Sequence, residues 1–268
     1  MEGAPLPPQA EVPVVAQPPP QRLPSKMRIA IAVGIVVILV LSSVLAGLLV
    51  AKFSVNLGSG GNPHQYPDNM TLTKSFTWTF QSHSYTLQLN MTAGEYYEYK
   101  DRSVSRSPEF NDYATMRQYV TPTDRIVIHL ATVLEGLAQN RSYDNEHTMD
   151  FMLAFVQNIG YSFDNVSTGH EDYWRYSVET LWDHTGDCED LSILFASLLE
   201  ATGHDAVLLL FTGASHMAVG ADCPGASGTY FTYDSVRYFY CETTAPGWLV
   251  GEEPPEIAGN MADVVQVP

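Results

Sequence analysis

Three side chains in the second half of the chain have the types and the order that covalent catalysis by a thiol requires. Cys188 lies in the short sequence Gly-Asp-Cys-Glu-Asp, and His216 and Glu242 follow it. A thiolate nucleophile needs a base within hydrogen-bond reach, and the base needs a group that orients it. We therefore take Cys188 as the candidate nucleophile, His216 as the candidate base and Glu242 as the candidate orienting acid.

Other residues could fill two of these roles. His184, in a loop shortly before the nucleophile, and His170 are alternative bases, and Asp222 and Asp234 are alternative orienting acids. A lone histidine in a strand is usually structural. We favour His216 as the base because a thiol precedes it and an acid follows it, and this combination favours a catalytic role over a structural one.

The chain has three cysteines, an odd number. In an exported protein two of them could pair and leave one free and reactive. Strand alternation predicts that Cys223 and Cys241 point away from the face of His216, so these two are the candidate disulfide. A metal site formed by Cys188, His216 and Cys241 is disfavoured, because the chain lacks a close ligand pair such as Cys-x-x-Cys. We predict no metal and no other cofactor.

The residues after Cys188 predict the helix that must carry it. Apolar residues at 191, 194, 195, 198 and 199 have the spacing of a buried helix face. Asp187 is a good N-cap, Asp190 follows it at the third helical position, and Gly203 supplies a stop signal. Cys188 would then lie in the first turn, where unpaired N–H groups and the helix dipole favour a thiolate. The alternative is a small buried residue at a helix start.

The rest of the second half predicts helices followed by strands. Residues 121–180 have mainly helical periodicity. Short apolar or alternating runs predict antiparallel strands at 206–211, 215–220, 230–233 and 237–243. This order is typical of an α+β domain. Ala218 and Gly220 share the strand face of His216, and their small size would leave room for a helix terminus to approach.

The first part of the chain predicts a membrane anchor. Residues 1–25 are rich in proline, and residues 29–51 are an uncharged run of apolar and small residues, long enough to cross a bilayer as a helix. Arg22, Lys26 and Arg28 precede this run. The positive-inside rule therefore places the tail in the cytoplasm and the later residues outside the cell.

Alternation between polar and apolar residues over 71–89 predicts a β-hairpin with its turn at Gln81-Ser82. The predicted segments are a Pro-rich cytoplasmic tail (1–27), a transmembrane helix (28–52), a flexible linker (53–68), a β-hairpin region (69–105) and a domain with the three candidate residues (106–268).

The chain is acidic, with a formal net charge of −17. A surface of this charge repels nucleic acid and anionic lipid, so we exclude nucleic acid as a partner. Four Asn-x-Ser/Thr sequons follow the apolar run and are candidate glycosylation sites in an exported protein. They are Asn69, Asn90, Asn140 and Asn165.

Three short blocks resemble the core of the transglutaminase-like superfamily. They are Gly-Asp-Cys-Glu-Asp at 186–190, His-Met-Ala-Val-Gly at 216–220 and Tyr-Cys-Glu-Thr-Thr at 240–244. Residues 155–161 and 179–181 also resemble its membrane-anchored microbial and archaeal members. The resemblance implies a papain-like α+β core, with helices packed on an antiparallel sheet. It also implies that Cys188, His216 and Glu242 form a catalytic triad, although the family more often has Asp at the last position.

The resemblance further implies acyl transfer from an amide of a protein or peptide substrate. Cys188 would attack the carbonyl, His216 would protonate the leaving amine, and a thioester would form. Backbone N–H groups at the helix start could stabilise the oxyanion, with Trp182 or Gln157 as an additional donor. Hydrolysis by a cysteine peptidase or amidase is the favoured outcome. The alternatives are a protein cross-linking transamidase and a non-catalytic binding or structural module at the cell surface.

Overall fold

The computed structural model describes residues 64–106 and 113–268. The predicted cytoplasmic tail and transmembrane helix lie outside these residues, as does most of the predicted linker. In the described part, no helix has both the length and the apolar character needed to cross a membrane. Helices and antiparallel sheets together make up the unit from residue 60 onward, so the predicted α+β class is confirmed.

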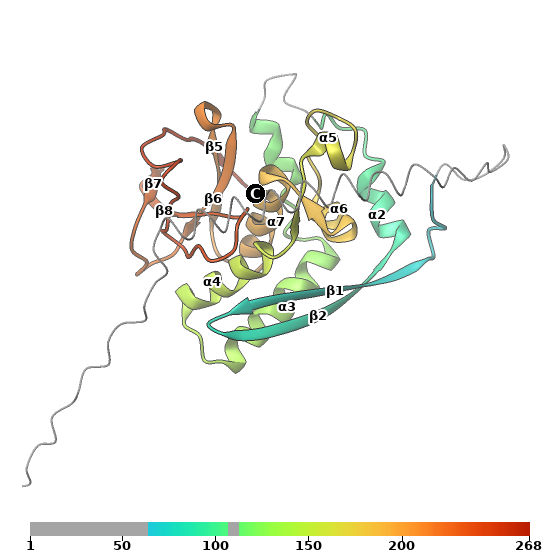
Figure 1. Ribbon diagram of the computed structural model, residues 1–268, viewed down its shortest axis with the longest axis horizontal. Helices are drawn as coiled ribbons and strands as arrows, with labels where there is room; N and C mark the ends of the chain where they lie inside the picture. Colours follow the sequence, from blue (N-terminus) through green and yellow to red (C-terminus); the bar gives the residue numbers. More distant parts are fainter. Residues whose placement is uncertain (1–63, 107–112) are drawn as a thin grey trace, which may run out of the picture. The chain divides into compact units, whose positions relative to one another are not determined.

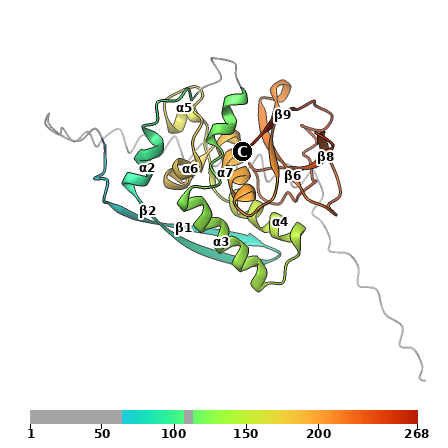
Figure 2. The ribbon, with the colours of Figure 1, turned by 180° about the vertical axis from the view of Figure 1, so that it is seen from behind.

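A β-hairpin, most of the helices and two short strands come before the main sheet along the chain (Figures 1 and 2). The helices are α2 (Ala93–Lys100), η2 (Tyr113–Tyr119), α3 (Arg125–Asn140), α4 (Asn145–Val156), α5 (Asp164–Ser167), α6 (Ser177–Asp183), α7 (Cys188–Ala201) and η3 (Thr212–Ala214). The strands are β1 (Thr71–Phe80), β2 (His83–Thr92), β3 (Gly160–Tyr161), β4 (Thr185–Gly186), β5 (Ala206–Phe211), β6 (His216–Asp222), β7 (Tyr230–Tyr233), β8 (Val236–Cys241) and β9 (Asp263–Gln266).

The strands β1 and β2 form the predicted hairpin. Phe80 pairs with His83, and the turn residues Gln81 and Ser82 both have positive φ angles, 47° and 65°. Alternate side chains of the hairpin are buried against α4. Trp78, for example, lies with its ring centroid 5.5 Å from that of Phe151. The hairpin and the helices therefore share one hydrophobic core.

Helix α2 was not predicted, although its start carries a recognisable signal. Thr92 and Glu95 form a capping box, in which each side chain binds the backbone N–H of the other residue. The helix buries Tyr97 and Tyr99. These tyrosines pack in the hydrophobic core.

Helix α7 lies at the centre of the unit, with the main sheet on one side and α6 on the other (Figure 1). The Asp187 side chain accepts the N–H of Asp190, so the predicted N-cap is present. Gly203 has a φ of +80°, the left-handed conformation that ends helices readily at glycine. Cys188 is the first residue of this helix, as the sequence predicts.

The main sheet has the strand order β7-β8-β6-β5-β9, and all its paired strands are antiparallel. Strand β9, close to the C-terminus, was not predicted, because its few residues show no clear alternation of buried and exposed positions. One face of the sheet packs on the helices, and the opposite face buries a smaller cluster that includes Phe211, Tyr238 and Tyr240.

One expectation about the His216 face is wrong. Ala218 belongs to the smaller cluster, whereas the residues of α7 belong to the larger one on the opposite face. A Cβ atom on Gly220 would lie 2.8 Å from both Tyr238 and Val207. The small size of Gly220 therefore leaves room for the side chains of Tyr238 and Val207, and α7 packs against the other side of β6.

The predicted Cys223–Cys241 disulfide is also wrong, because all three cysteines are free. Both side chains do point away from the His216 face, as predicted, and join the larger core cluster. The strand register separates them. Cys241 lies opposite Val219, whereas Cys223 is four residues further along the chain. Four strand residues span about 13 Å, but a disulfide needs Cα atoms within about 7 Å of each other.

Candidate active site

His216 and Glu242 meet at one end of the main sheet. His216 is the first residue of β6, Glu242 directly follows β8, and these two strands are neighbours. The Nε2 atom of His216 lies 3.0 Å from Oε2 of Glu242. The fold therefore brings together the candidate base and the candidate orienting acid. This contact leaves Nδ1 as the ring nitrogen that can exchange a proton with another group.

Both oxygens of Glu242 are bound by donors. Oε1 accepts the backbone N–H and the hydroxyl of Thr244, at 2.9 and 2.5 Å. Oε2 accepts the hydroxyl of Tyr240 at 2.8 Å in addition to its contact with His216. Burial raises the pKa of the carboxyl, but hydrogen bonds from His216 and Thr244 and the charge of His216 lower it overall. Glu242 is thus held as a buried carboxylate with a fixed direction.

Cys188 lies beside the backbone at the start of β6. The backbone N–H of Met217, the residue after His216, is near enough to the Cys188 sulfur to lower the pKa of the thiol. Helix α7 packs against β6, and the thiol is 7% exposed. The nucleophile candidate and the base candidate therefore approach the same end of one strand, from the helix side and from the strand terminus.

The sequence predicted that the helix start favours a thiolate at Cys188, but the surroundings of the sulfur favour the protonated thiol. Its S–H donates to Oε2 of Glu189 at 2.8 Å. Burial raises the pKa of this thiol well above its usual range, and the charges of Glu189 and Asp187 raise it further, against the lowering effect of the Met217 N–H. The favourable helix terminus is outweighed, because a buried thiolate beside a carboxylate is electrostatically costly.

Replacing Glu189 with glutamine is expected to lower the pKa of Cys188, because the change removes a negative charge from the neighbouring side chain. Alkylation of Cys188 by iodoacetamide at pH 7 should become severalfold faster, and its pH–rate profile should move to lower pH. Glu200→Gln, near the other end of α7, is the matched control, since Glu200 accepts the N–H of Ala206 and a glutamine can do the same. An unchanged profile in Glu189→Gln would contradict the role given to this carboxylate.

A buried charge network holds the start of α7 in place. The guanidinium of Arg175 is inaccessible to solvent and pairs with Asp164 and Asp190. Asp190 also accepts the backbone N–H of Arg175 at 2.8 Å. Burial raises the pKa of Asp190 to about 7, although Arg175 lowers it. Asp190 therefore ties α7 to the preceding loop, whereas the sequence suggested it only as a partner in the helix cap.

The alternative bases and acids lie elsewhere. His184 packs on the ring of Phe76 at 4.5 Å, and His170 stacks on Tyr173 at 5.7 Å. Asp234 lies in the β7–β8 turn, and Asp222 ends β6 at the opposite end from His216. Cys241, considered from sequence as a metal ligand with His216, points to the opposite sheet face from it.

Neither additional oxyanion donor is in a position to act. Gln157 uses its side-chain Nε2 to donate to the backbone oxygens of Glu242 and Trp248, at 2.7 and 3.0 Å. Trp182 stacks on Tyr96, with ring centroids 5.1 Å apart, in a pocket formed with Tyr66. The backbone N–H groups at the start of α7 remain as the candidate oxyanion donors.

Sequence reasoning missed four groups that surround these residues. Tyr240 could have been found, because it lies two positions before Glu242 on the same strand face. Glu189 and Thr244 belong to the quoted sequence blocks but had no assigned role.

Tyr161 pairs with Gly186 across β3 and β4, just before Cys188. Burial raises its pKa, and the nearby charges of Cys188 and Glu242 raise it further, so its ring borders the site.

No protein-family model and no curated protein matches the chain. Among solved structures, it is similar to a candidate cysteine protease from Cytophaga hutchinsonii at 11% identity, over 74% of this chain and 73% of that one, with a TM-score of 0.33. It is also similar at 13% identity to a candidate protease from Parabacteroides distasonis, over 68% of this chain and 41% of that one, with a TM-score of 0.33. A third structure, a TGase, shares 13% identity over 70% of this chain and 48% of that one, with a TM-score of 0.32.

Proposed function

We propose that the chain is a membrane-anchored, extracytoplasmic cysteine peptidase or amidase of the transglutaminase-like type. Its substrates would be peptide or isopeptide amides of a protein or peptide. The observation that carries the proposal is the contact between His216 and Glu242, with Cys188 close to the backbone N–H of the residue after His216. A buried carboxylate that orients an imidazole next to a thiol is the arrangement that thiol acyl transfer requires.

The mechanism begins with transfer of the Cys188 thiol proton to His216. The Cys188 thiol leaves Glu189 and gives its proton to Nδ1 of His216, and the Glu242 carboxylate stabilises the resulting imidazolium. The thiolate then attacks the carbonyl carbon, while N–H groups at the start of α7 bind the oxyanion. His216 returns the proton to the leaving amine, and a thioester remains. Water, deprotonated by His216, hydrolyses the thioester to the acid and regenerates the thiol.

Anchoring and export are part of the same proposal. The uncharged run at 29–51, with basic residues before it, supports a membrane helix with its N-terminus in the cytoplasm. The four sequon asparagines are all exposed, which is compatible with glycosylation outside the cell. The residues after the anchor would then meet extracellular proteins or peptides.

Labelling with a thiol-reactive probe at neutral pH tests the proposal. We expect covalent modification at Cys188, its loss in Cys188→Ala, and labelling about tenfold slower or more in His216→Ala, because a general base contributes at least about a hundredfold to proton transfer. Cys223→Ala is the matched control and should label like the unchanged chain, since Cys223 is buried in the core.

Labelling that is equal in His216→Ala and the unchanged chain, or absent altogether, would contradict the catalytic proposal. It would favour a binding or structural module. If labelling is as expected, incubation with a primary amine and a glutamine peptide separates the two reactions. Incorporation of the amine in preference to hydrolysis would identify a transamidase.

A further inference from the structure

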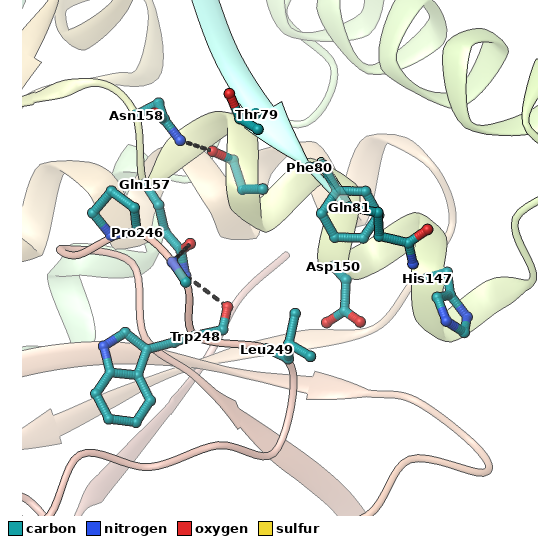
Figure 3. Close-up of a pocket in the computed structure, with 12 residues that line it drawn as sticks. Thr79, Phe80, Gln81, His147, Asp150, Gln157, Asn158, Pro246, Trp248 and Leu249 are labelled. Carbon is teal, nitrogen blue, oxygen red and sulfur yellow. Dashed lines mark hydrogen bonds between the residues drawn. The ribbon is translucent and has the colours of Figure 1, made fainter. Parts of the chain in front are cut away.

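A cavity of about 230 Å³ lies between the tip of the hairpin, α4 and residues 246–249 (Figure 3). A single water occupies about 30 Å³ of liquid, so this space can receive a side chain. Its wall combines apolar groups such as Phe80 and Leu249 with the amides of Gln81 and Asn158. Polar and ionisable residues make up half of this lining, so a ligand would meet hydrogen-bonding groups as well as an apolar surface.

The carboxyl group of Asp150 points into this cavity, between Leu249 and His147 (Figure 3). Asp150 is 5% exposed. Its Oδ1 atom accepts the N–H of Val250 at 2.8 Å, whereas Oδ2 has no hydrogen-bond partner in the described part of the chain. Oδ2 is not among the buried side-chain atoms that lack a partner, so solvent reaches it through the cavity and a ligand donor can replace water there.

The charges around Asp150 do not neutralise it. None of the residues that line the cavity is Lys or Arg. His147, which lines the cavity, directs Nδ1 to Asp144 at 2.7 Å. Burial raises the pKa of Asp150 to about 6, and the charges of Glu146 and Glu252 contribute to this, against the lowering effects of the Val250 N–H and of His147. The carboxyl therefore has no Lys or Arg counter-ion in the cavity wall, and it faces the open cavity.

The cavity is connected to the candidate active site through Gln157. This residue lines the cavity, and its Nε2 donates to the backbone oxygen of Glu242 at 2.7 Å. Its Oε1 accepts the N–H of Gly247 at 3.1 Å, in the loop that forms the opposite wall. A ligand in the cavity would thus touch the segment that carries the orienting acid.

We propose that this cavity is a recognition pocket for a cationic side chain, a lysine ammonium or an arginine guanidinium, with Asp150 as its counter-ion. Such a ligand would supply the donor that Oδ2 lacks, while its alkyl chain would contact Phe80 and Leu249. That the ligand belongs to a peptide substrate rests on the proposed function, whereas the pocket itself does not.

The test uses the full ¹⁵N-labelled chain carrying Cys188→Ala, which can bind but not react. It is titrated with Nα-acetyl-lysine amide, Nα-acetyl-arginine amide and, as the uncharged probe, Nα-acetyl-norleucine amide. NMR signals of the side-chain amides of Gln81, Gln157 and Asn158 report on the cavity. We expect one or both cationic probes to shift these signals and to bind about tenfold more tightly than the norleucine probe. The two cationic titrations identify which side chain the pocket prefers.

Asp150→Asn tests whether the charge of Asp150 binds the ligand or whether its carboxyl has only a structural role. Asparagine can still accept the Val250 N–H but has no charge. It should weaken binding of the preferred cationic probe about tenfold or more and leave the norleucine probe unchanged. Glu146→Gln, on the same helix but outside the cavity wall, should change binding by less than about threefold. Equal binding of the cationic and norleucine probes, or undiminished cationic binding in Asp150→Asn, would overturn the proposal.

The outcomes also distinguish this proposal from the proposed function. Cationic binding that depends on Asp150, together with absent labelling of Cys188, would leave the pocket in place and remove the catalytic role. Normal labelling of Cys188 without any cationic preference would do the reverse.

Discussion

Replacing Arg175 with methionine is expected to lower the free energy of unfolding by about 3–5 kcal/mol, because it leaves buried carboxylates without their partner. The guanidinium Nη1 binds Asp164 at 3.0 Å and also pairs with Asp190, and Nη2 donates to Ser167 at 2.7 Å. Methionine fills much of the volume but supplies neither charge nor donors. Urea denaturation at pH 7 measures the loss.

The same variant should show a distinctive dependence on pH. Arg175 lowers the pKa of Asp190, so its removal raises that pKa further above the value in the unfolded chain. A group with a raised carboxyl pKa in the folded state binds protons more readily there, so stability increases as pH falls. The deficit relative to the unchanged chain should therefore shrink between about pH 9 and pH 7, and change little below pH 7, where Asp190 is protonated in both chains.

Arg102→Met is the matched control for this prediction. Arg102 also pairs with a carboxylate, Glu98, but at 3.8 Å on the exposed side of α2. Its loss should cost no more than about 0.5 kcal/mol. If Arg175→Met and Arg102→Met have the same effect, the buried network does not hold the start of α7 as described.

Replacing Glu242 with glutamine is expected to reduce the rate of acyl transfer about 10³- to 10⁴-fold, the scale seen when the orienting acid of a triad becomes an amide. Both oxygens of Glu242 accept hydrogen bonds, two from Thr244 and the others from Tyr240 and His216. Glutamine has only one oxygen. If its NH₂ group faces Nε2 of His216, that nitrogen must become an acceptor, and Nδ1 then carries the proton and cannot take one from the thiol.

The measurement is kcat on a peptide amide, with the rate of Cys188 alkylation as a second readout that needs no substrate. Glu242→Asp is the control, because it keeps the charge and shortens the side chain by one methylene. We expect this variant to retain far more activity than Glu242→Gln. Comparable activity in Glu242→Gln and the unchanged chain would mean that the carboxylate does not orient the base.

Much of the local structure could be predicted from the sequence, because it depends on neighbouring residues. The helix after Cys188 follows from the apolar spacing, the Asp187 cap and Gly203, all within one short stretch. The hairpin turn at Gln81-Ser82 was predictable for the same reason. Where a prediction failed at this level, as for α2, a local signal was present in Thr92 and Glu95 but was not used.

The pairings between distant segments could be predicted only in part. The order of thiol, imidazole and acid pointed to Cys188, His216 and Glu242, and the fold does bring His216 and Glu242 into contact. The strand register was not available, and it is the register that keeps Cys223 and Cys241 apart. For the same reason, we expected the helix to approach the Ala218 and Gly220 face of β6, whereas α7 packs against the other face.

The sequence by itself determined the α+β class, the helix that begins at Cys188 and the identity of the three candidate residues, since periodicity and short motifs encode these features. Only the tertiary structure decided the protonation of the Cys188 thiol, the partner of Asp190 and the exposure of Asp150 to a cavity. These properties arise from burial and from charges on segments far apart in the chain, such as Arg175 opposite Asp190. Electrostatic energies depend on distance and solvent access, which packing sets and residue order does not.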